Sequence, residues 1–420
     1  MSFGAAAWAA YGAAGTLAAP FAKAHLARRA RRGKEDGDRS AEKRGFPSAA
    51  LATRPVWLHA VSVGETVAAL TLARRIRAEG FDILLTTGTP TAAARAAGED
   101  VTHQYAPLDA PPFVARFLDH WRPVAAIFIE SEIWPATLAA LARREVPRAH
   151  VNAHLSARSF RRWARMPALS RPLFGSIPLA LAQSEADASR FAALGTPRAV
   201  ATGNLKFDAA VPEPSPAAVS ALKDGLGGRP CWLAASIHPG EEDAVVAAHK
   251  RVASRIDELT TFVAPRHMET AALVERAADA AGIAVAGRRS AGDPPAPGLY
   301  LVDTMGELGA FFAVAPLVFL GASLVPLGGH NPAEPAAFGA ALVTGPACGT
   351  MFEPFVEGDA ADVVADADAL ADTVAARLSD PGALRCRGAA AGRVLDAQRG
   401  ATDRVIHELA QTLDAARRLA

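Results

Sequence analysis

The sequence lacks the short motifs that mark several large enzyme classes. It contains no GxxxxGK[ST] phosphate loop, no HExxH metal motif, no serine nucleophile elbow and no GxGxxG fingerprint after its first expected strand. No Asp-x-Asp pair ends a strand in the N-terminal half, where it would hold a divalent metal on a diphosphate. A leaving group with a single phosphate tolerates that absence, because arginine, lysine and helix amides can neutralise it.

Neither sign of charge is in excess. The chain has 44 Lys and Arg against 43 Asp and Glu, a net charge of +1. A dedicated nucleic-acid-binding domain is strongly basic, so this class is disfavoured. The cysteines Cys231, Cys348 and Cys386 follow no metal-ligand spacing, and so sparse a set fits a reducing compartment. The 420 residues suffice for two or three domains with real cores.

The N-terminus differs from the rest of the chain. Phe3 to Ala22 carries no charge, and its length suits a bilayer span, although Ala and Gly make it weakly apolar. A basic cluster follows directly and would keep the downstream chain cytoplasmic: Lys23, Arg28, Arg29, Arg31, Arg32 and Lys34. A cleaved signal peptide is disfavoured because no cationic region precedes the apolar part. We predict membrane association, either by spanning or by lying in the interface, over a plain surface helix.

Short apolar runs alternate with Ala-rich stretches from residue 56 onward, which predicts parallel sheets covered by helices on both faces. In the first half the expected strands are Val56–Val61, Ile83–Thr87, Ala125–Ile129, His150–Asn152 and Leu179–Gln183. In the second half they are Cys231–Ala235, Thr261–Ala264, Ala284–Ala286, Leu299–Val302, Leu317–Leu320 and Ala341–Thr344.

Prolines and glycines interrupt this alternation between Val211 and Pro230. We therefore predict an α/β protein of two doubly wound units. The expected boundaries are an anchor and basic segment at 1–45, a first α/β domain at 46–212, a linker at 213–229 and a second α/β domain at 230–420. Ligands of such sheets bind at the C-terminal strand ends, and a domain interface makes a natural cleft.

Three glutamates follow strands of the first domain. Glu65 ends the segment Ser62-Val63-Gly64-Glu65 at a helix start, where it is a candidate general base or merely favours the helix dipole. Glu130 and Glu132 follow the apolar strand 125–129. In extended backbone both side chains point the same way, so like charges raise one pKa. Alternatively, one of them caps the next helix, which Pro135 helps to start.

Two cations stand at similar positions. Lys206, just before the expected linker, can compensate a phosphate or a buried carboxylate, although a plain surface lysine is the default. Arg266 follows a strand and can form two hydrogen bonds to a phosphate through its guanidinium.

The segment Asp303–Leu308 also follows a strand, and its Gly306 allows the backbone to approach a ligand closely. His238 is a weaker candidate.

The stretch from residue 317 to 335 is the most informative of the chain. The strand Leu317–Leu320 leads to Gly328 and Gly329, which tolerate unusual backbone angles. Asn331 then suits a helix cap, with Pro332 at the first helical position and Glu334 at the third. Exposed amides at such a helix start favour a phosphate, although a simple capping box explains the same residues equally well.

Together these segments resemble the 3-deoxy-D-manno-octulosonic acid (Kdo) transferases, which build the inner core of lipopolysaccharide. Eight short segments occur in the family's order: His59–Glu65, Thr86–Thr91, Glu130–Pro135, Asn152–Ser159, Gly203–Asp208, Pro265–His267, Asp303–Leu308 and Gly328–Glu334. The apolar N-terminus with its basic run is similar to the family's membrane anchor.

The resemblance implies a GT-B fold and inverting transfer of Kdo from CMP-Kdo to a lipid A precursor at the cytoplasmic face of the inner membrane. It implies no cofactor, no metal, no nucleic acid and no obligate protein partner. Glu65 matches the family's base, and Glu130 and Lys206 match residues that support the transition state. The CMP-contacting positions would be Pro265, Arg266, Met305, Gly306, Glu307, Asn331, Pro332, Ala333 and Glu334.

Four positions depart from the family pattern. His154 stands where Arg is usual, Ser131 where Thr is usual, and Ala322 and Val302 where Gly is frequent. None of them is the expected base, and His154 replaces a fixed positive charge with a weaker one. A basic stretch also suits lipid A phosphates and the membrane surface, or is only a solvated helix face: Arg158, Arg161, Arg162 and Arg165.

Two other functions are compatible with the sequence. The nearer one is another GT-B enzyme, which uses a different nucleotide sugar or epimerises one. The farther one is a non-catalytic membrane-bound scaffold, which the presence of Glu65, Glu130 and Arg266 disfavours.

Overall fold

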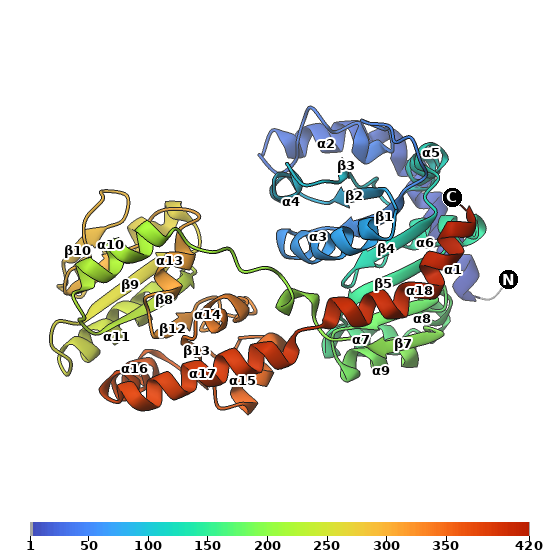
Figure 1. Ribbon diagram of the computed structural model, residues 1–420. Coiled ribbons are helices and arrows are strands. Elements are labelled where there is room, and N and C mark those ends of the chain that lie inside the picture. Colours follow the sequence, from blue (N-terminus) through green and yellow to red (C-terminus); the bar gives the residue numbers. More distant parts are fainter. Residues whose placement is uncertain (1–2, 420) are drawn as a thin grey trace. The chain divides into compact units, whose positions relative to one another are not determined.

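The computed structural model describes residues 3–419 and divides into two compact units (Figure 1). Unit 1 comprises the residues up to 209 together with those from 399 on, and unit 2 comprises residues 210–398. The last helix therefore belongs to unit 1, whereas the sequence had placed everything after 230 in the second domain. The expected linker at 213–229 is also partly wrong, because it contains helix α10 (Pro216–Leu226) of unit 2.

Unit 1 is built on a seven-stranded parallel sheet in the order β3-β2-β1-β4-β5-β6-β7. The central strand β1 pairs in register with both neighbours, Val56 opposite Ile83 and opposite Ala125. The strands are β1 Val56–Ala60, β2 Ile83–Thr87, β3 Thr102–Tyr105, β4 Ala125–Ile129, β5 Arg148–Ala153, β6 Leu179–Ala182 and β7 Arg198–Ala201.

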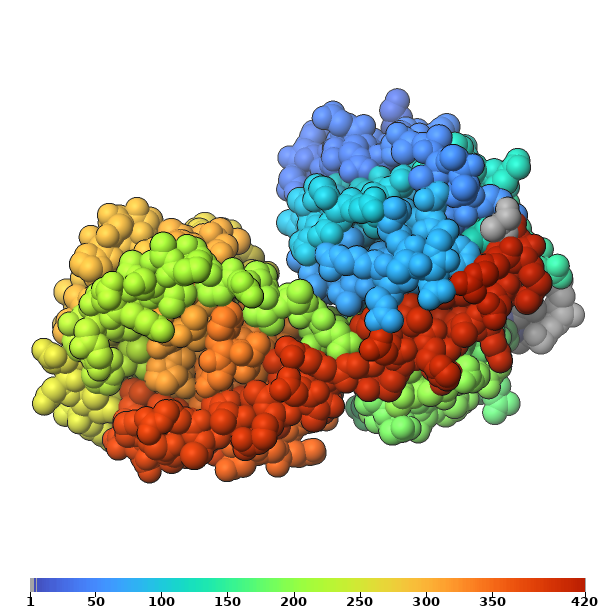
Figure 2. Space-filling view, viewed as in Figure 1, coloured from blue at the N-terminus to red at the C-terminus, as the bar shows by residue number. Residues whose placement is uncertain are grey.

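Helices cover both faces of this sheet, as near-continuous apolar strands require. On one face α3 and the C-terminal helix α18 share a core with β1 and β4, in which Leu70, Leu409 and Leu413 are buried. Figure 2 shows α18, in red, lying along unit 1. The helices are α1 Phe3–Ala18, α2 Ala22–Ala30, α3 Val63–Ala78, α4 Pro90–Ala96, α5 Pro111–Trp121, α6 Pro135–Arg143, α7 Ala157–Ala164, α8 Pro167–Phe174, α9 Glu185–Leu194 and α18 Ala401–Leu419, with short 3-10 turns at Ala19–Phe21, Glu42–Arg44 and Leu205–Phe207.

Unit 2 repeats the architecture with a parallel sheet in the order β10-β11-β9-β8-β12-β13-β14. Its strands are β8 Cys231–Ile237, β9 Thr260–Pro265, β10 Val285–Arg288, β11 Gly298–Leu301, β12 Leu317–Leu320, β13 Ala341–Thr344 and β14 Ala361–Val363. Its helices besides α10 are α11 Glu242–Ala253, α12 Ala271–Ala280, α13 Leu308–Phe312, α14 Ala333–Ala337, α15 Glu353–Glu357, α16 Ala367–Ser379 and α17 Pro381–Gln398, with 3-10 turns at Met268–Thr270 and Thr350–Phe352.

The eleven expected strands all occur, within two residues at each end, and the prediction of two doubly wound units is confirmed. The structure adds β3, β7 and β14, each at the edge of a sheet. An edge strand pairs on one side only and can carry polar residues, so its sequence shows no continuous apolar run.

The N-terminal helix α1 packs on unit 1. The indole Nε1 of Trp8 donates to the carbonyl of Leu169 in α8 at 3.1 Å, and the hydroxyl of Tyr11 donates to Asp109 at 3.0 Å. Among residues 3–419, no helix combines the length and apolarity needed to cross a bilayer. Of the two expected modes of membrane association, a span is therefore not found among these residues. On the N-terminal segment Leu17 and Phe21 are 76% and 73% exposed.

The loop after β12 is fixed by one buried carboxylate. Glu241, fully buried at the start of α11, accepts hydrogen bonds from the amides of His238, Ala322, Ser323 and Leu324 at 2.7–2.9 Å. This loop turns through Ala322, whose φ of 60° lies in the left-handed region. A residue with a Cβ is strained there, so the frequent glycine of the family is the less strained choice.

We predict that Ala322→Gly stabilises unit 2 by about 0.5–1 kcal/mol, since relief of the left-handed strain exceeds the extra entropy of glycine in the unfolded chain. Urea unfolding of the full chain measures the change. The same substitution at exposed Ala376 in helix α16 is the control, and it should destabilise by about 0.5–1 kcal/mol. A loss of stability in Ala322→Gly comparable to that of the control would contradict the prediction.

Candidate functional site

Three glutamates and one lysine meet at the C-terminal edge of the sheet in unit 1. Glu65 follows β1, Glu130 and Glu132 follow β4, and Lys206 lies on the turn after β7. Parallel strands end at one edge, which is why residues so far apart in sequence converge here. Glu130 and Lys206 both influence the ionisation of Glu65, and Glu65 influences that of Glu132.

Glu65 occupies the third position of helix α3 and is 8% exposed. Its carboxylate accepts from the Val61 amide at 2.7 Å and from the Ser62 hydroxyl at 2.8 Å, while the Ser62 hydroxyl accepts from the Glu65 amide at 3.3 Å. This resembles a capping box shifted by one residue, because Glu65 accepts from the Val61 amide and not from that of the N-cap residue Ser62. A role at the helix start and the position required of a base therefore coexist in one residue. Burial raises the pKa of Glu65, which the two hydrogen bonds and Lys206 oppose.

Glu130 and Lys206 form an ion pair, with Nζ 2.7 Å from Oε1. Glu130 has a φ of 61°, an uncommon angle for a residue with a side chain and one that recurs at functional sites. Lys206 passes over Gly64, because a Cβ placed on that glycine would lie 3.7 Å from the lysine Cε. The lysine is thus held between the base candidate's helix and Glu130.

Glu132 accepts a hydrogen bond from the indole of Trp134 at 2.7 Å. Burial, then the charges of Glu65 and Glu130, raise the pKa of Glu132 to about 7. The pKa of one of the two neighbouring carboxylates is thus raised, but not for the expected reason: Glu130 has a φ of 61° rather than extended backbone, and its charge contributes less than burial and Glu65. The alternative, that one of them caps α6, is wrong: Asp109 accepts from the amides of Ala136 and Thr137 at 3.0 and 2.8 Å.

Two asparagine side chains, which the sequence did not reveal, hold the backbone of the turn that carries Lys206. The side chain of Asn152 accepts from the Leu205 amide at 2.9 Å, and that of Asn204 accepts from the Lys206 amide at 3.0 Å. Asn152 adopts a φ of 55° and lies buried at the end of β5. The only available signal was its place within a segment shared with the family.

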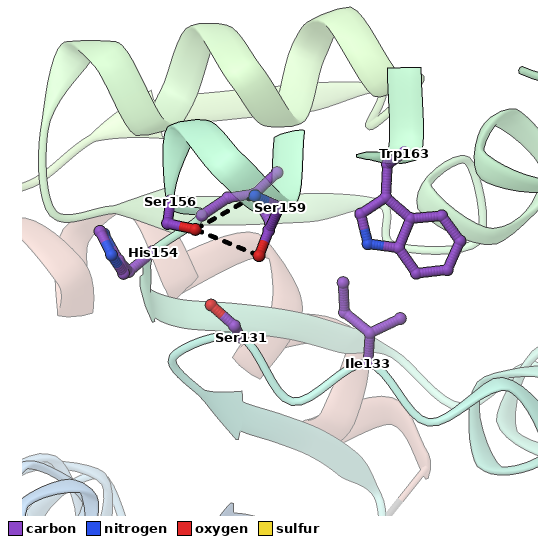
Figure 3. A pocket seen from close by; sticks show the side chains of 7 residues that line it. Ser131, Ile133, His154, Ser156, Ser159 and Trp163 are labelled. Carbon is purple, nitrogen blue, oxygen red and sulfur yellow. Dashed lines mark hydrogen bonds between the residues drawn. The ribbon is translucent and has the colours of Figure 1, made fainter. Parts of the chain in front are cut away.

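A pocket of about 390 Å³ lies beside Glu130, between the loop after β4 and helix α7 (Figure 3). At its margin His154 Nδ1 lies 3.2 Å from a carboxylate oxygen of Asp187. The hydrogen bond to Asp187 raises the pKa of His154. The pocket is lined by Ser131, Ile133, His154, Leu155, Ser156, Ser159 and Trp163.

In unit 2 the expected donor-binding residues lie at the C-terminal strand ends. Pro265 ends β9, and the Arg266 amide donates to the Ile237 carbonyl at 2.9 Å while its side chain is exposed. Arg266 lowers the pKa of His330 in the loop before α14, after the larger effects of burial and of His238. This electrostatic effect indicates that Arg266 and the Asn331 segment share one edge.

The segment after β11 presents Met305, which is 69% exposed, and Gly306, whose φ is 83°. Glu307 is less available to a ligand, because its carboxylate already accepts from Arg289 Nε at 3.1 Å and from the Thr304 hydroxyl at 2.7 Å. The hydrogen bond from Arg289 holds the pKa of Glu307 below its usual value. Arg289 was not identified from the sequence.

The Asn331 turn largely follows the expectation. Gly328 and Gly329 have φ values of 94° and 71°, and a Cβ on Gly329 would lie 2.7 Å from the Cys348 carbonyl oxygen. The Asn331 side chain accepts from the Ala333 amide at 2.9 Å, and α14 begins at Ala333, one residue later than expected. The side chain of Glu334 is exposed beside it.

Comparison with known proteins shows the family to which the chain belongs. A family model described as 3-deoxy-D-manno-octulosonic-acid transferase (kdotransferase) matches residues 38–209. The 3-deoxy-D-manno-octulosonic acid transferase of Haemophilus influenzae is 33% identical over 90% of this chain and 92% of its own. The chain belongs to the Kdo transferase family. The protein of the same name from Bordetella pertussis is 32% identical over 84% of this chain and 86% of its own.

Solved structures show the fold. A glycosyltransferase from Rickettsia africae superposes with a TM-score of 0.60 at 10% identity, over 87% of this chain and 99% of that one. The UDP-GlcNAc 2-epimerase from Neisseria meningitidis gives 0.58 at 10% identity, over 85% and 100%. The GT-B-like fold is thereby confirmed. Family membership makes the protein a glycosyltransferase and excludes the scaffold interpretation.

We predict that Glu132→Gln removes a pH-dependent loss of stability. An unfolded glutamate ionises near pH 4.5 and Glu132 in the fold near 7, so the folded state alone holds the proton between these values. The carboxyl therefore destabilises the fold progressively as pH rises from about 4.5 to about 7. Urea midpoints of wild type and Glu132→Gln should diverge in favour of the variant across this window.

The control is Glu213→Gln, which changes an exposed glutamate of unit 2. Its urea midpoint should run parallel to that of the wild type at every pH. Equal pH dependence of wild type and Glu132→Gln would show that Glu132 ionises normally in the fold.

Proposed function

We propose that the protein transfers Kdo from CMP-Kdo to a sugar hydroxyl of a lipid A precursor, with inversion at the anomeric carbon. One observation carries the proposal: a buried carboxylate at the end of β1 stands beside an ion pair, within a chain of the Kdo transferase family. The donor is inferred from the family resemblance and from the residues at the strand ends of unit 2.

Glu65 would act as the general base. A raised pKa makes its carboxylate a better proton acceptor, and each oxygen keeps a second lone pair after accepting its hydrogen bond from Val61 or Ser62. The base would take the proton of the acceptor hydroxyl as that oxygen attacks the anomeric carbon in line. The lysine of the Glu130–Lys206 pair would stabilise the negative charge that develops on the leaving phosphate oxygen as its bond to the anomeric carbon breaks.

Unit 2 would hold the CMP portion of the donor. The exposed Arg266 guanidinium suits the single phosphate, and Glu334 and Asn331 suit the ribose hydroxyls. Pro265, Met305, Gly306, Glu307, Pro332 and Ala333 would complete the contacts. CMP leaves as a phosphate whose second pKa is about 6, so no strong acid is needed to protonate it.

The surface of unit 1 supports the proposed lipid A acceptor and the proposed location at the membrane. Helix α7 and the residue after it expose Arg158, Arg161, Arg162 and Arg165, and α7 contains no acidic residue. Phe160 and Trp163 on the same helix pack against the core, which directs the arginines outward. We propose that this helix and the N-terminal helices bind the anionic cytoplasmic face of the inner membrane as interfacial elements.

The Glu65→Gln protein should bind CMP normally and transfer Kdo about 10² to 10⁴ times more slowly. The Gln oxygen can accept from the Val61 amide and the Gln NH2 group can donate to the Ser62 hydroxyl, so the fold is preserved while the base is lost. Mass spectrometry of the product formed from CMP-Kdo and a lipid A precursor measures transfer, and calorimetry measures CMP binding. Turnover close to that of the wild type would remove Glu65 from the role of base.

Reversing the charge of Arg158, Arg161 and Arg162 to Glu should weaken binding to anionic vesicles at least tenfold, since each basic residue near such a surface contributes about 1 kcal/mol. Co-sedimentation with phosphatidylserine vesicles measures this. The control reverses three exposed arginines of unit 2, Arg276, Arg385 and Arg393. Unchanged vesicle binding in the α7 variant, or an equal loss in the control, would count against the surface.

A further inference from the structure

The pocket beside Glu130 combines polar donors with an apolar wall. Figure 3 shows His154 and Trp163 at opposite ends of it, with Ser131 and Ile133 on one side and Ser156 and Ser159 on the other. Its volume of about 390 Å³ lies within the range of small-ligand sites. No carboxylate is among the residues that line it. An arrangement of hydroxyls, one imidazole and one indole suits a sugar that carries an anionic group.

The imidazole of His154 is oriented by a carboxylate behind it. Asp187 has a side chain only 4% exposed, and it also accepts from the Leu155 amide at 2.9 Å and the Ser184 hydroxyl at 2.8 Å. This fixed carboxylate keeps a proton on Nδ1 of His154, which leaves Nε2 as the nitrogen available to a ligand. A third of the His154 side chain is exposed, so a ligand can reach it.

Helix α7 adds further positive potential. The Ser159 amide donates to the Ser156 hydroxyl at 3.2 Å and the Phe160 amide to the Ser156 carbonyl at 2.9 Å, so the amides of residues 157 and 158 precede the bonded turn. Four arginines lie on or directly after this helix, and the positive end of its dipole points to Ser156. These features strengthen anion binding next to His154.

We infer that this pocket is the acceptor subsite for a phosphate monoester carried by a saccharide, and that His154 is its specificity-determining residue. The inference rests on the proposed function, because it assigns a phosphate group of the proposed acceptor to the pocket beside His154 in unit 1. Ser131 lines the pocket and is the neighbour of both Glu130 and Glu132 in sequence. A sugar anchored by its phosphate here would therefore lie close to the carboxylates that accompany the base.

The identity of residue 154 gives this subsite a pH dependence. The charged groups that face His154 are Asp187 and Arg190 of α9 and Glu130 after β4; the two acids favour the imidazolium and the arginine opposes it. Phosphate monoesters become dianions above a pH of about 6. Binding should therefore be strongest where the dianion and the imidazolium coexist, and it should fall at higher pH as His154 loses its proton. Arginine, usual in the family at this position, keeps its charge throughout.

The test is calorimetry of the full-length protein at pH 6.5 and 8.5. The probes are an acyl-free glucosamine disaccharide phosphate, the same disaccharide without phosphate, and inorganic phosphate. The wild type should bind the phosphorylated disaccharide about tenfold more tightly at pH 6.5 than at 8.5, as loss of one charge-assisted hydrogen bond implies. His154→Arg should bind it equally at both pH values, and His154→Gln should bind it weakly at both. The phosphate-free disaccharide should bind about tenfold more weakly than the phosphorylated one at pH 6.5.

Three outcomes would overturn the inference: the same affinity of the wild type at both pH values, a pH dependence that persists in His154→Arg, or equal affinity for the disaccharide with and without phosphate. Inorganic phosphate that binds as tightly as the disaccharide phosphate would show a general anion site and refute the saccharide assignment. Circular dichroism and urea unfolding, measured in parallel, verify that each variant is folded, since His154 lies in unit 1 and CMP binding reports only on unit 2. Absence of CMP binding in the wild type would instead refute the proposed function, so the two failures are distinguishable.

Discussion

The ion pair between Lys206 and Glu130 is the interaction on which the charge balance at the strand ends of unit 1 depends. Three glutamates approach one another at this edge, and their charges repel. One ammonium group within hydrogen-bonding distance of Glu130 offsets part of that repulsion, and the proton retained by Glu132 near neutral pH offsets more. Glu65 can then be an anion in a mostly buried place. Removing the lysine would shift Glu65 toward its neutral form, because Lys206 lowers the pKa of that carboxyl.

The two sheets show which strands a sequence reveals. The inner strands are sandwiched between helices, so most of their side chains are apolar, and the sequence located these strands within two residues. The outer strands β3 and β14 pair on one side only; β3 contains Thr102, His103 and Gln104, and β14 contains Asp362. Such a composition does not differ from that of a loop. Membership of α18 in unit 1 was equally hidden, because its amphipathic pattern fits either unit.

The residues of the candidate site also fall into those that the sequence reveals and those that it does not. Residues that follow an apolar strand could be assigned to the ligand edge by a geometric rule, and Glu65, Glu130 and Lys206 do converge there. Residues that hold the site together could not be found, because their partners are remote in sequence. Asn152 binds a residue 53 positions away, and Glu241 binds amides 81 to 83 positions away. Only the folded chain shows those pairings.

The return of the chain to unit 1 after residue 398 has a consequence for how the protein is made. The buried face shared by α3, β1 and β4 is closed by Val405, Leu409 and Leu413 of α18, which are synthesised only after the whole of unit 2. During translation the apolar face of the first 209 residues stays exposed until α18 has been synthesised. Unit 2, by contrast, is complete once residue 398 has been added. The amino-terminal portion is therefore the one most in need of chaperone protection during translation.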